Sequence, residues 1–275
     1  MKKKSKVVMI TGATSGFGKA TAHHLAANGY IVYGFGRSAG DINSENGNGP
    51  IMLKMDVNDD FSVKEAVNTV VKNEGRIDVL LNVAGVGISG SVEDVSIEEV
   101  RGIFETNVFG SLRVTQAVLP HMREAGSGLI VFVSSIGGLI GLPFQGIYSS
   151  TKFAVEGLAE ALSIEVESFG IDVVIVEPGD FATDFTAKRI KAYGAECDES
   201  AYREAYRCAL NKIEKDESGG CHPDIFAVTM RKIIEARRRK MRYMMGDPMQ
   251  KSSVMLKRLL PAKVFGKLIG KYNGL

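Results

Sequence analysis

The stretch V-F-V-S-S-I-G-G-L-I-G-L-P-F-Q-G-I-Y-S-S-T-K, from Val131 to Lys152, decides the fold and places its chemistry. Residues 129–133 are apolar and mostly β-branched, which predicts a buried strand, and two serines stand where that strand should end. A glycine-rich bend leads to Tyr148, which opens a segment with helical spacing of its apolar residues. Reactive side chains therefore lie where a strand ends and a helix begins.

Tyr148 and Lys152 are four residues apart at the start of this helix, predicted over 148–168, so their side chains share one helix face. An ammonium about 4 Å from the phenol, at a dielectric near 20, favours the phenolate by roughly 4 kcal/mol, on the order of three pKa units. We therefore predict that Lys152 lowers the pKa of Tyr148 into the range of general acid/base catalysis. Ser135 would hydrogen-bond a substrate oxygen at the same point. Taken alone, the Tyr-x-x-x-Lys spacing also fits an ordinary helix start with an exposed cation.

The composition predicts one large α/β domain, because 45% of the 275 residues are hydrophobic. A formal net charge of +2 gives no whole-chain argument for nucleic acid as a partner. The charge is uneven: residues 229–275 hold 13 Lys and Arg against Glu235 and Asp247, a balance of +11, which leaves −9 for the preceding residues. The C-terminal part is therefore a basic block.

Cys197, Cys208 and Cys221 have neither paired nor metal-ligand spacing, so we expect no disulfide framework and no metal site. This cysteine usage favours a cytoplasmic location. The apolar run before Thr11 is too short for a signal peptide or a membrane span, and we expect the fold to begin at Val7.

Residues 7–10 form an apolar run typical of a strand covered on both faces, and T-G-A-T-S-G-F-G, from Thr11 to Gly18, follows directly. Residues 19–28 then predict a helix that Gly29 closes. In this order, backbone N–H groups and the helix dipole face a pyrophosphate. The turn therefore predicts nucleotide binding, with a tight structural turn as the alternative.

The second predicted strand, 31–35, is followed by Gly36, Arg37 and Ser38. A site that prefers NAD usually has Asp or Glu here to accept from the ribose 2′-hydroxyl. A guanidinium beside a hydroxyl instead suits the 2′-phosphate of NADP, so we predict NADP over NAD. The alternative is a solvated loop arginine. Residues 39–50, rich in Gly, Asn and Asp, should form a surface loop.

Further strands are predicted at 51–55, 79–81 and 171–176, with helices between them, which favours parallel pairing in a doubly wound sheet. Ligands bind beyond the carboxyl ends of such strands. We expect one edge of the sheet to collect the groups that follow each strand, namely Gly12, Asp56, Asn82, Ser135 and Pro178. Asp56 could accept from an adenine amino group, whereas Asp59 or Asp60 caps the helix predicted over 61–73.

Asn107 lies among apolar neighbours in a helix predicted over 98–124. A buried amide is costly unless it is hydrogen-bonded. The sequence leaves two roles open for this side chain, structural pairing or holding a catalytic water.

Beyond residue 185 the alternation of strand and helix lapses. Residues 185–223 are polar and charged, with a helix expected near 200–215, and we predict a lid over the pocket. A helix over 224–239 and a strand near 242–245 complete a domain of residues 1–250. Residues 251–275 belong to the same domain and predict one or two basic amphipathic helices around Pro261. We expect them to pack on the domain or a sister subunit rather than on a membrane surface.

In order and spacing, the motifs resemble those of the short-chain dehydrogenase/reductase family over roughly residues 5–250. This likeness implies a single-domain Rossmann-type α/β fold, an NADP(H) or NAD(H) cofactor, and a homodimer or homotetramer. The matching pieces are T-G-A-T-S-G-F-G from Thr11, Asp56-Val57, N-V-A-G from Asn82, Asn107, Ser135, Y-S-S-T-K from Tyr148 and E-P-G from Glu177.

The resemblance implies that Tyr148 is the acid/base, that Lys152 lowers its pKa and holds the nicotinamide ribose, that Ser135 polarises the substrate oxygen, and that Asn107 orders a water. It implies that the remaining cofactor contacts come from Gly12, Thr14, Ser15, Gly16, Phe17, Gly18, Arg37, Ser38, Asp56, Val57, Asn82, Ala84, Gly85, Pro178, Gly179, Phe181 and Thr183. Ser15 departs from the basic residue that many NADP-using members have before the second glycine.

The predicted reaction interconverts a ketone or aldehyde and its alcohol on an apolar molecule, such as a steroid, a retinoid or another lipophilic carbonyl. We expect substrate contacts from Ser135, Leu142, Phe144, Tyr148 and Phe185, because apolar residues dominate the loops around the site. The alternative is a sensing or scaffolding protein that binds NADP without turnover, although a pure binder needs no proton relay.

Overall fold

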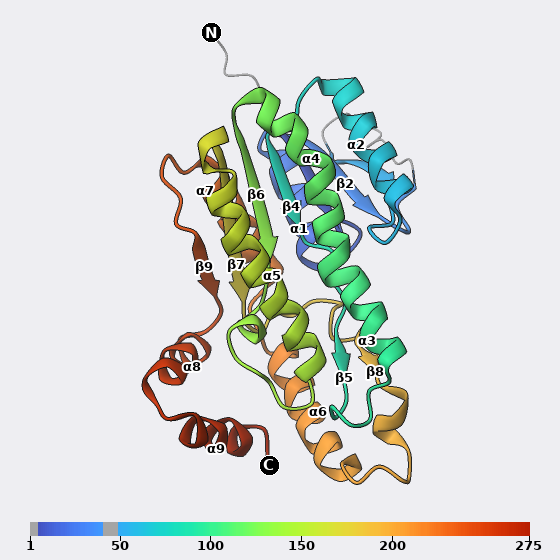
Figure 1. Cartoon of the computed structure of the whole chain (residues 1–275), viewed down its shortest axis with the longest axis vertical. Helices are drawn as coiled ribbons and strands as arrows, with labels where there is room; N and C mark the ends of the chain where they lie inside the picture. Colours follow the sequence, from blue (N-terminus) through green and yellow to red (C-terminus); the bar gives the residue numbers. More distant parts are fainter. Residues whose placement is uncertain (1–4, 41–48) are drawn as a thin grey trace.

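The apolar runs near the start of the chain form the centre of one parallel sheet. The structure is a computed structural model, and it describes residues 5–40 and 49–275. The strands lie in the order β3-β2-β1-β4-β6-β7-β9, which is the predicted doubly wound Rossmann-type arrangement in a single domain (Figure 1). Their bounds are β1 Val7–Thr11, β2 Ile31–Gly36, β3 Ile51–Lys54, β4 Val79–Asn82, β6 Gly128–Val133, β7 Ile171–Pro178 and β9 Arg242–Met245.

Helices cover both faces of this sheet, so its central strands are buried on both sides. On one face lie α2 (Asp60–Glu74), α4 (Ser111–Ala125) and α5 (Gly146–Glu165). On the other face lie α1 (Gly16–Ala27) and α7 (Pro223–Glu235), which pack against each other. The two layers leave the carboxyl ends of the strands free for a site.

Local signals in the sequence place several helix ends. Asp59 caps α2 by accepting a hydrogen bond from the Phe61 N–H, and Gly75 closes the same helix in a left-handed conformation. The helix predicted over 98–124 is divided: α3 (Ile97–Phe104) and α4 are joined by a π-helical segment at Glu105–Gly110, which holds Asn107. π-Helical turns are rare and frequently occur at functional sites.

The segment predicted as a lid includes structure that the sequence pattern did not indicate. The short strand β8 (Ile190–Lys191) pairs with β5 (Ile88–Ser89) in a second, two-stranded sheet, and α6 (Arg203–Ser218) follows. Both lie below the main sheet in Figure 1. Most of the loop predicted over 39–50 lies outside the described residues.

The basic C-terminal residues form two helices, α8 (Pro248–Leu259) and α9 (Ala262–Tyr272), with the break at Pro261 as predicted. Val254 and Phe265 are buried against Ile136 and Ile140, which follow β6. The segment therefore packs on its own domain through one narrow stripe of apolar residues. Among the described residues, no helix is both long and apolar enough to cross a membrane.

Candidate active site

A cavity of about 840 Å³ opens at the carboxyl ends of the strands. It runs from the glycine turn after β1, past the ends of β4 and β6, to α6, α8 and α9. Twenty-one of the residues named as site residues from the sequence line it: Gly12, Thr14, Ser15, Gly16, Phe17, Gly18, Arg37, Ser38, Asp56, Val57, Ala84, Gly85, Ser135, Leu142, Tyr148, Lys152, Pro178, Gly179, Phe181, Thr183 and Phe185.

The glycine turn brings backbone close to the cavity because it lacks side chains at three positions. Gly12 and Gly16 have positive φ angles of 67° and 49°. A Cβ atom on Gly12 would lie 2.9 Å from the Ala84 Cα, and one on Gly18 would overlap the Gly12 carbonyl. The first residues of α1 line the cavity, so the N–H groups and the positive end of the helix dipole lie beside it.

The next part of the cavity lies at the ends of β2 and β3. Arg37 and Ser38 are exposed and line it, together with Asp56 and Val57. The Asp56 carboxylate accepts a hydrogen bond from the Asn58 N–H at 3.0 Å, which fixes its orientation. A guanidinium, a hydroxyl and a carboxylate thus border the region next to the glycine turn.

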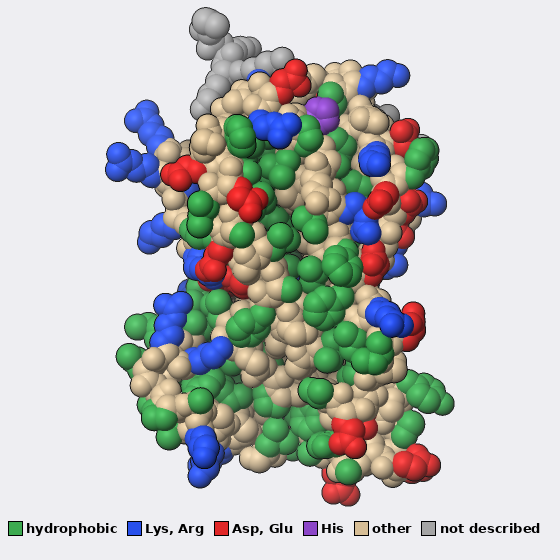
Figure 2. All heavy atoms as spheres, in the orientation of Figure 1, with side chains coloured by type: hydrophobic (Ala, Val, Ile, Leu, Met, Phe, Trp, Pro, Cys, Tyr) green, Lys and Arg blue, Asp and Glu red, His purple; other side chains and the backbone are tan. Residues whose placement is uncertain are grey.

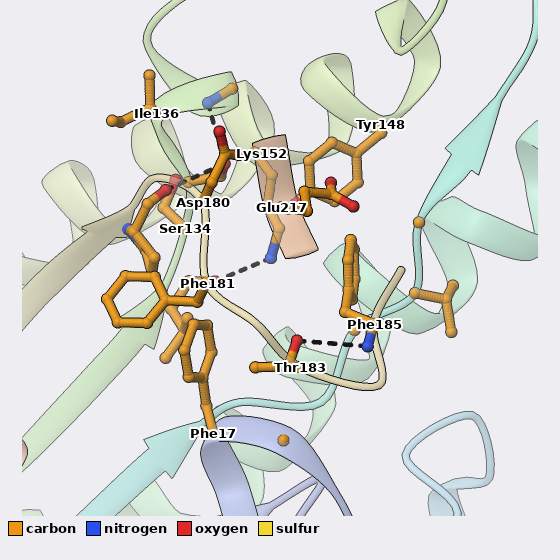
Figure 3. A pocket seen from close by; sticks show the side chains of 18 of the residues that line it. Phe17, Ser134, Ile136, Tyr148, Lys152, Asp180, Phe181, Thr183, Phe185 and Glu217 are labelled. Carbon is orange, nitrogen blue, oxygen red and sulfur yellow. Dashed lines mark hydrogen bonds between the residues drawn. The ribbon is translucent and has the colours of Figure 1, made fainter. Parts of the chain in front are cut away.

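The tyrosine predicted as the acid/base faces the middle of the cavity (Figure 3). Tyr148 is 8% exposed, and its ring lies 5.7 Å from the ring of Phe185. The Ser135 hydroxyl lies near enough to lower the pKa of the Tyr148 hydroxyl; its oxygen accepts from the Gly137 N–H at 3.0 Å, and it donates to the Pro178 carbonyl at 3.4 Å. A carbonyl oxygen placed here would meet two hydroxyl donors.

Lys152 lies one turn after Tyr148 on α5 and is 6% exposed. Its ammonium nitrogen donates to the Val133 carbonyl oxygen at 2.9 Å and lies 5.8 Å from the centre of the Tyr148 ring. A Cβ atom on Gly85 would be 3.6 Å from this nitrogen. The lysine is therefore a fixed part of the cavity wall, and the alternative of an exposed cation is wrong.

The predicted lowering of the tyrosine pKa is not what the structure shows. Burial is the main cause that raises the pKa of Tyr148 to about 12; the Ser135 hydroxyl and the Arg189 guanidinium oppose this shift, and the Glu217 and Asp180 carboxylates add to it. Burial likewise lowers the pKa of Lys152 to about 8, although Glu156 opposes this shift. The loss of hydration of both groups on burial, which the spacing of four residues does not show, is the largest cause of each shift.

Three of the predicted site residues do not line the cavity. Asn82 is buried and donates its amide N–H to the Thr115 hydroxyl at 2.9 Å, toward α4. Asn107 accepts from the Val86 N–H and donates to the Val86 carbonyl and to Thr151, which favours structural pairing for its side chain. Phe144, at φ 59°, packs its ring 5.7 Å from Tyr206.

Opposite the glycine turn, the cavity has a polar end that the sequence did not indicate. Glu217 of α6 lies there, beside the Tyr148 ring in Figure 3. Its carboxylate pairs with the buried Arg189 guanidinium and accepts from the Thr186 hydroxyl at 2.6 Å. Asp180 lies on the loop after β7, and burial together with Glu217, Asp216 and Asp247 raises its pKa to about 6. This end of the cavity therefore holds two acidic side chains, Asp180 and Glu217, of which Glu217 is paired with Arg189.

The remaining wall is apolar and comes from the C-terminal helices. Leu256 of α8 and Phe265, Leu268 and Ile269 of α9 line it, facing Ile140 and Leu142. The Gln250 side chain of α8 accepts from the Asp180 N–H at 3.2 Å and donates to the Asp180 carboxylate. No local motif in the sequence marks Glu217 or these helices as part of the site. For the helices, the only signal in the sequence was the basic charge of the C-terminal residues.

Beneath the cavity, Arg242 of β9 pairs with three carboxylates, two of which are buried. Its guanidinium pairs with Glu177 at the end of β7 and with Glu156 and Glu160 of α5. Glu177 is 1% and Glu156 5% exposed. The pairing fixes the strand end before Pro178 to the helix that carries Tyr148 and Lys152.

The cavity suits a nicotinamide dinucleotide. The glycine turn supplies a cradle that side chains would fill, with a helix N-terminus beside it for phosphate groups. Arg37, Asp56, Lys152 and Thr183 supply polar groups along the rest of its length. The donors and acceptors match a phosphorylated, ribose-bearing ligand next to a proton donor.

The chain resembles known short-chain dehydrogenases in sequence and in fold. A family model described as short chain dehydrogenase matches residues 6–194. The chain is 43% identical over 256 residues to the 3-ketodihydrosphingosine reductase of Bacteroides thetaiotaomicron, covering 93% of each chain. A short-chain dehydrogenase from Streptomyces avermitilis has a similar structure, with a TM-score of 0.83 at 32% identity over 97% of this chain and 96% of that one. An alcohol dehydrogenase from Thermococcus sibiricus, complexed with 5-hydroxy-NADP, has a TM-score of 0.72 at 26% identity over 89% and 97%.

Proposed function

The chain belongs to the short-chain dehydrogenase/reductase family, and from this membership we propose that it reduces the ketone of a long-chain amphiphile with NADPH. The observation that carries the proposal is the position of the Ser135 and Tyr148 hydroxyls between a dinucleotide cradle and a cavity with one polar and one apolar end. A carbonyl at the two hydroxyls would have a polar group on one side and an alkyl chain on the other.

The substrate class that fits best is a long-chain 2-amino ketone such as 3-ketodihydrosphingosine, the compound in the name of the Bacteroides relative. Its ammonium lies next to the ketone, as the Glu217 carboxylate lies next to Tyr148. Its alkyl chain would follow the apolar wall of α8 and α9. This proposal replaces the purely apolar substrate expected from the loop residues, because Glu217 and Asp180 make one end of the cavity polar.

The protonation states favour reduction. A pKa of about 12 keeps Tyr148 protonated at neutral pH, so its hydroxyl is ready to donate a proton to the substrate oxygen. Ser135 would hydrogen-bond the same oxygen, and Lys152, when charged, would stabilise the phenolate left on Tyr148. A bound NADPH, held by the glycine turn, Arg37, Asp56 and Lys152, would supply the hydride to the carbonyl carbon.

Arg37 and Ser38 support NADP(H) over NAD(H), because their guanidinium and hydroxyl line the cavity beside the glycine turn. We propose residues 185–223, together with α8 and α9, as the lid that closes the substrate end. Assembly as a homodimer or homotetramer stays a prediction from the family.

The test is oxidation of NADPH by the purified protein with 3-ketodihydrosphingosine, followed by identification of the alcohol. Turnover is expected with NADPH, and the Tyr148→Phe variant should lose it while still binding NADPH. Turnover retained by that variant would refute the assignment of the proton donor. Tight NADPH binding without turnover of this or any other ketone would instead favour a non-catalytic role.

A further inference from the structure

The α8–α9 segment, residues 248–275, carries charge of one sign only. It contains no Asp or Glu, and all of its cationic side chains are exposed: Lys251, Lys257, Arg258, Lys263, Lys267 and Lys271. Lys257 donates to the Leu139 carbonyl and lies 4.9 Å over the Phe153 ring, which ties α8 to the domain. Lys263, Lys267 and Lys271 are spaced by four, so they form one row along α9.

The same segment leaves large apolar side chains in solvent. Packing on the domain uses Val254 and Phe265, whereas a second set is between 42% and 76% exposed: Met249, Met255, Leu256, Leu259, Val264, Leu268 and Leu275. Figure 2 shows hydrophobic side chains with lysine and arginine among them over these helices, at the lower left. A group of exposed apolar side chains with cations among them marks an interaction site more often than a solvated face.

This surface adjoins the mouth of the cavity. Met249, Leu256, Leu268 and Tyr272 are exposed and also line the cavity. The edge formed by α8 and α9 is therefore shared between the outside of the molecule and the apolar end of the substrate site.

We propose that the α8–α9 segment docks on a bilayer surface that carries anionic headgroups, with both helices lying in the plane of the interface. The two helices, of 12 and 11 residues, are about 18 and 16 Å long, well short of the roughly 30 Å of a bilayer core. Exposed leucine and methionine side chains enter the headgroup boundary, and the lysines contact acidic lipid phosphates.

A second copy of the chain fits this surface less well than a bilayer does. A two-fold contact would place the same patch on both sides, bringing six cations against six without a carboxylate in either segment. Anionic headgroups supply the complementary charge, and acyl chains supply the complement to the apolar side chains.

Docking gives the cavity a route to its substrate, a consequence that rests on the proposed function. A long-chain amino ketone resides in the bilayer, and the cavity edge shared with α8 and α9 would lie against that bilayer. The ketone would then reach Tyr148 without passing through water.

The experiment is co-sedimentation of the full chain with vesicles of phosphatidylcholine and phosphatidylglycerol in equal parts, and with vesicles of phosphatidylcholine alone. We expect binding to the anionic vesicles to be at least about tenfold stronger, and to weaken as salt is raised. Equal binding to both vesicles, or no binding to either, would overturn the proposal.

Two variants locate the surface. The first variant removes the basic row by combining Lys263→Gln, Lys267→Gln and Lys271→Gln. The second variant removes exposed apolar groups that do not line the cavity, by combining Leu259→Ser and Val264→Ser. Each should weaken vesicle binding by at least about tenfold while leaving the melting temperature unchanged. A matched control, with Arg237, Arg238 and Lys240 changed to Gln, removes three exposed cations before β9 and should bind as the parent does.

Enzyme assays separate this proposal from the proposed function. With vesicle-borne 3-ketodihydrosphingosine, the Lys263/Lys267/Lys271 variant should lose rate, whereas a short-chain water-soluble ketone should be reduced at the parent rate. Vesicle binding without turnover of either ketone would refute the proposed function and leave docking intact. Turnover without vesicle binding, or a tail variant that changes the oligomeric mass instead of vesicle binding, would refute docking.

Discussion

At the residue scale, the centre of the cavity holds two groups in the protonation states that burial favours. Tyr148 keeps its proton, with a pKa of about 12, and Lys152 holds its proton weakly, with a pKa of about 8. A tyrosine that keeps its proton suits the reducing direction, and a lysine that titrates near neutral pH can respond when a phenolate forms beside it. Removing these two side chains from water costs folding free energy, and the same burial sets their protonation states.

The first prediction concerns that cost. Lys152→Met should lower the rate of reduction by about 10³-fold and raise the free energy of unfolding at pH 7 by about 2 to 3 kcal/mol, since a pKa lowered from 10.5 to about 8 reports a buried charge. The penalty is fully present below pH 8 and is relieved as pH rises toward 10.5, where the unfolded lysine also loses its proton. The stability advantage of Lys152→Met over the parent protein should therefore decrease between pH 8 and pH 10.5.

Urea unfolding at several pH values measures this gain, with Lys251→Met, on an exposed site, as the control. A variant less stable than the parent at pH 7 would contradict the reasoning, because the lysine would then stabilise the fold.

A second residue-scale prediction concerns the polar end of the cavity. Glu217→Gln should raise the KM of a long-chain amino ketone by about 10-fold to 100-fold, because a charge-assisted hydrogen bond to the ammonium is lost. The KM of the same ketone without the amine should change by less than about threefold. Glu214→Gln, one turn earlier on α6 and paired with Lys191 outside the cavity, is the matched control.

The change also leaves Arg189 buried without its carboxylate, so the double variant Arg189→Met/Glu217→Gln serves as a check on folding. An equal rise in KM for both ketones in a folded variant would contradict this prediction. It would show that Glu217 maintains the shape of the cavity and does not bind the substrate ammonium.

At the element scale, β9 joins the sheet and anchors the site from below. Its Arg242 guanidinium holds Glu177 of β7 and Glu156 of α5, and burial raises the pKa of both carboxyls while Arg242 opposes the shift. β7 carries the loop with Asp180, and α5 carries Tyr148 and Lys152. A short edge strand therefore links β7 to α5, the helix that carries Tyr148 and Lys152.

Arg242→Met should destabilise the fold by about 3 to 5 kcal/mol at pH 8, because two buried carboxylates lose their counter-ion. The loss of folding free energy in this variant should be smaller at pH 5 than at pH 8. Both carboxyls have raised pKa values, and in the variant they are protonated earlier as pH falls, which removes the uncompensated charge. Chemical denaturation at the two pH values measures this, with Arg237→Met as an exposed control. A loss below about 1 kcal/mol, or one that grows in acid, would contradict it.

At the scale of the whole molecule, the cofactor cradle and the substrate end come from opposite ends of the sequence. Residues 7–40 and 49–85 hold the glycine turn and its neighbours, and residues 180–275 hold the polar end, the apolar wall and the segment that we propose as a lid. The central stretch from Val131 to Lys152 lies between them and carries Ser135, Tyr148 and Lys152, the proposed reacting groups. Binding of a dinucleotide should therefore stabilise the whole domain.

NADPH at about 100 times its Kd should add about 2.7 kcal/mol to the free energy of unfolding, seen as a rise in Tm of at least about 5 °C. NADH at the same concentration should give a smaller rise, because Arg37 would have no 2′-phosphate to contact. Arg37→Glu should remove the difference between the two cofactors, whereas Arg101→Glu, an exposed change on α3, should preserve it. Equal shifts with both cofactors in the parent protein would contradict the preference for NADP.

The sequence by itself determined the sheet, the glycine turn and the Ser135, Tyr148 and Lys152 set. These features depend on local patterns: apolar runs fix the buried strands, glycines fix the turn, and a spacing of four fixes a shared helix face. Each pattern needs only neighbouring residues, so it can be read before the chain is folded.

Only the tertiary structure decided the protonation states, the polar end of the cavity and the packing of the basic tail along the cavity wall. The pKa of Tyr148 depends on burial by Phe185 and on Glu217, which is 69 positions later in the chain. Two predicted site residues point away from the cavity. Asn82 donates a hydrogen bond to the Thr115 hydroxyl instead, and the Phe144 ring packs against the Tyr206 ring. Hydration and electrostatic energies depend on which distant segments meet, and no local spacing in the sequence contains that information.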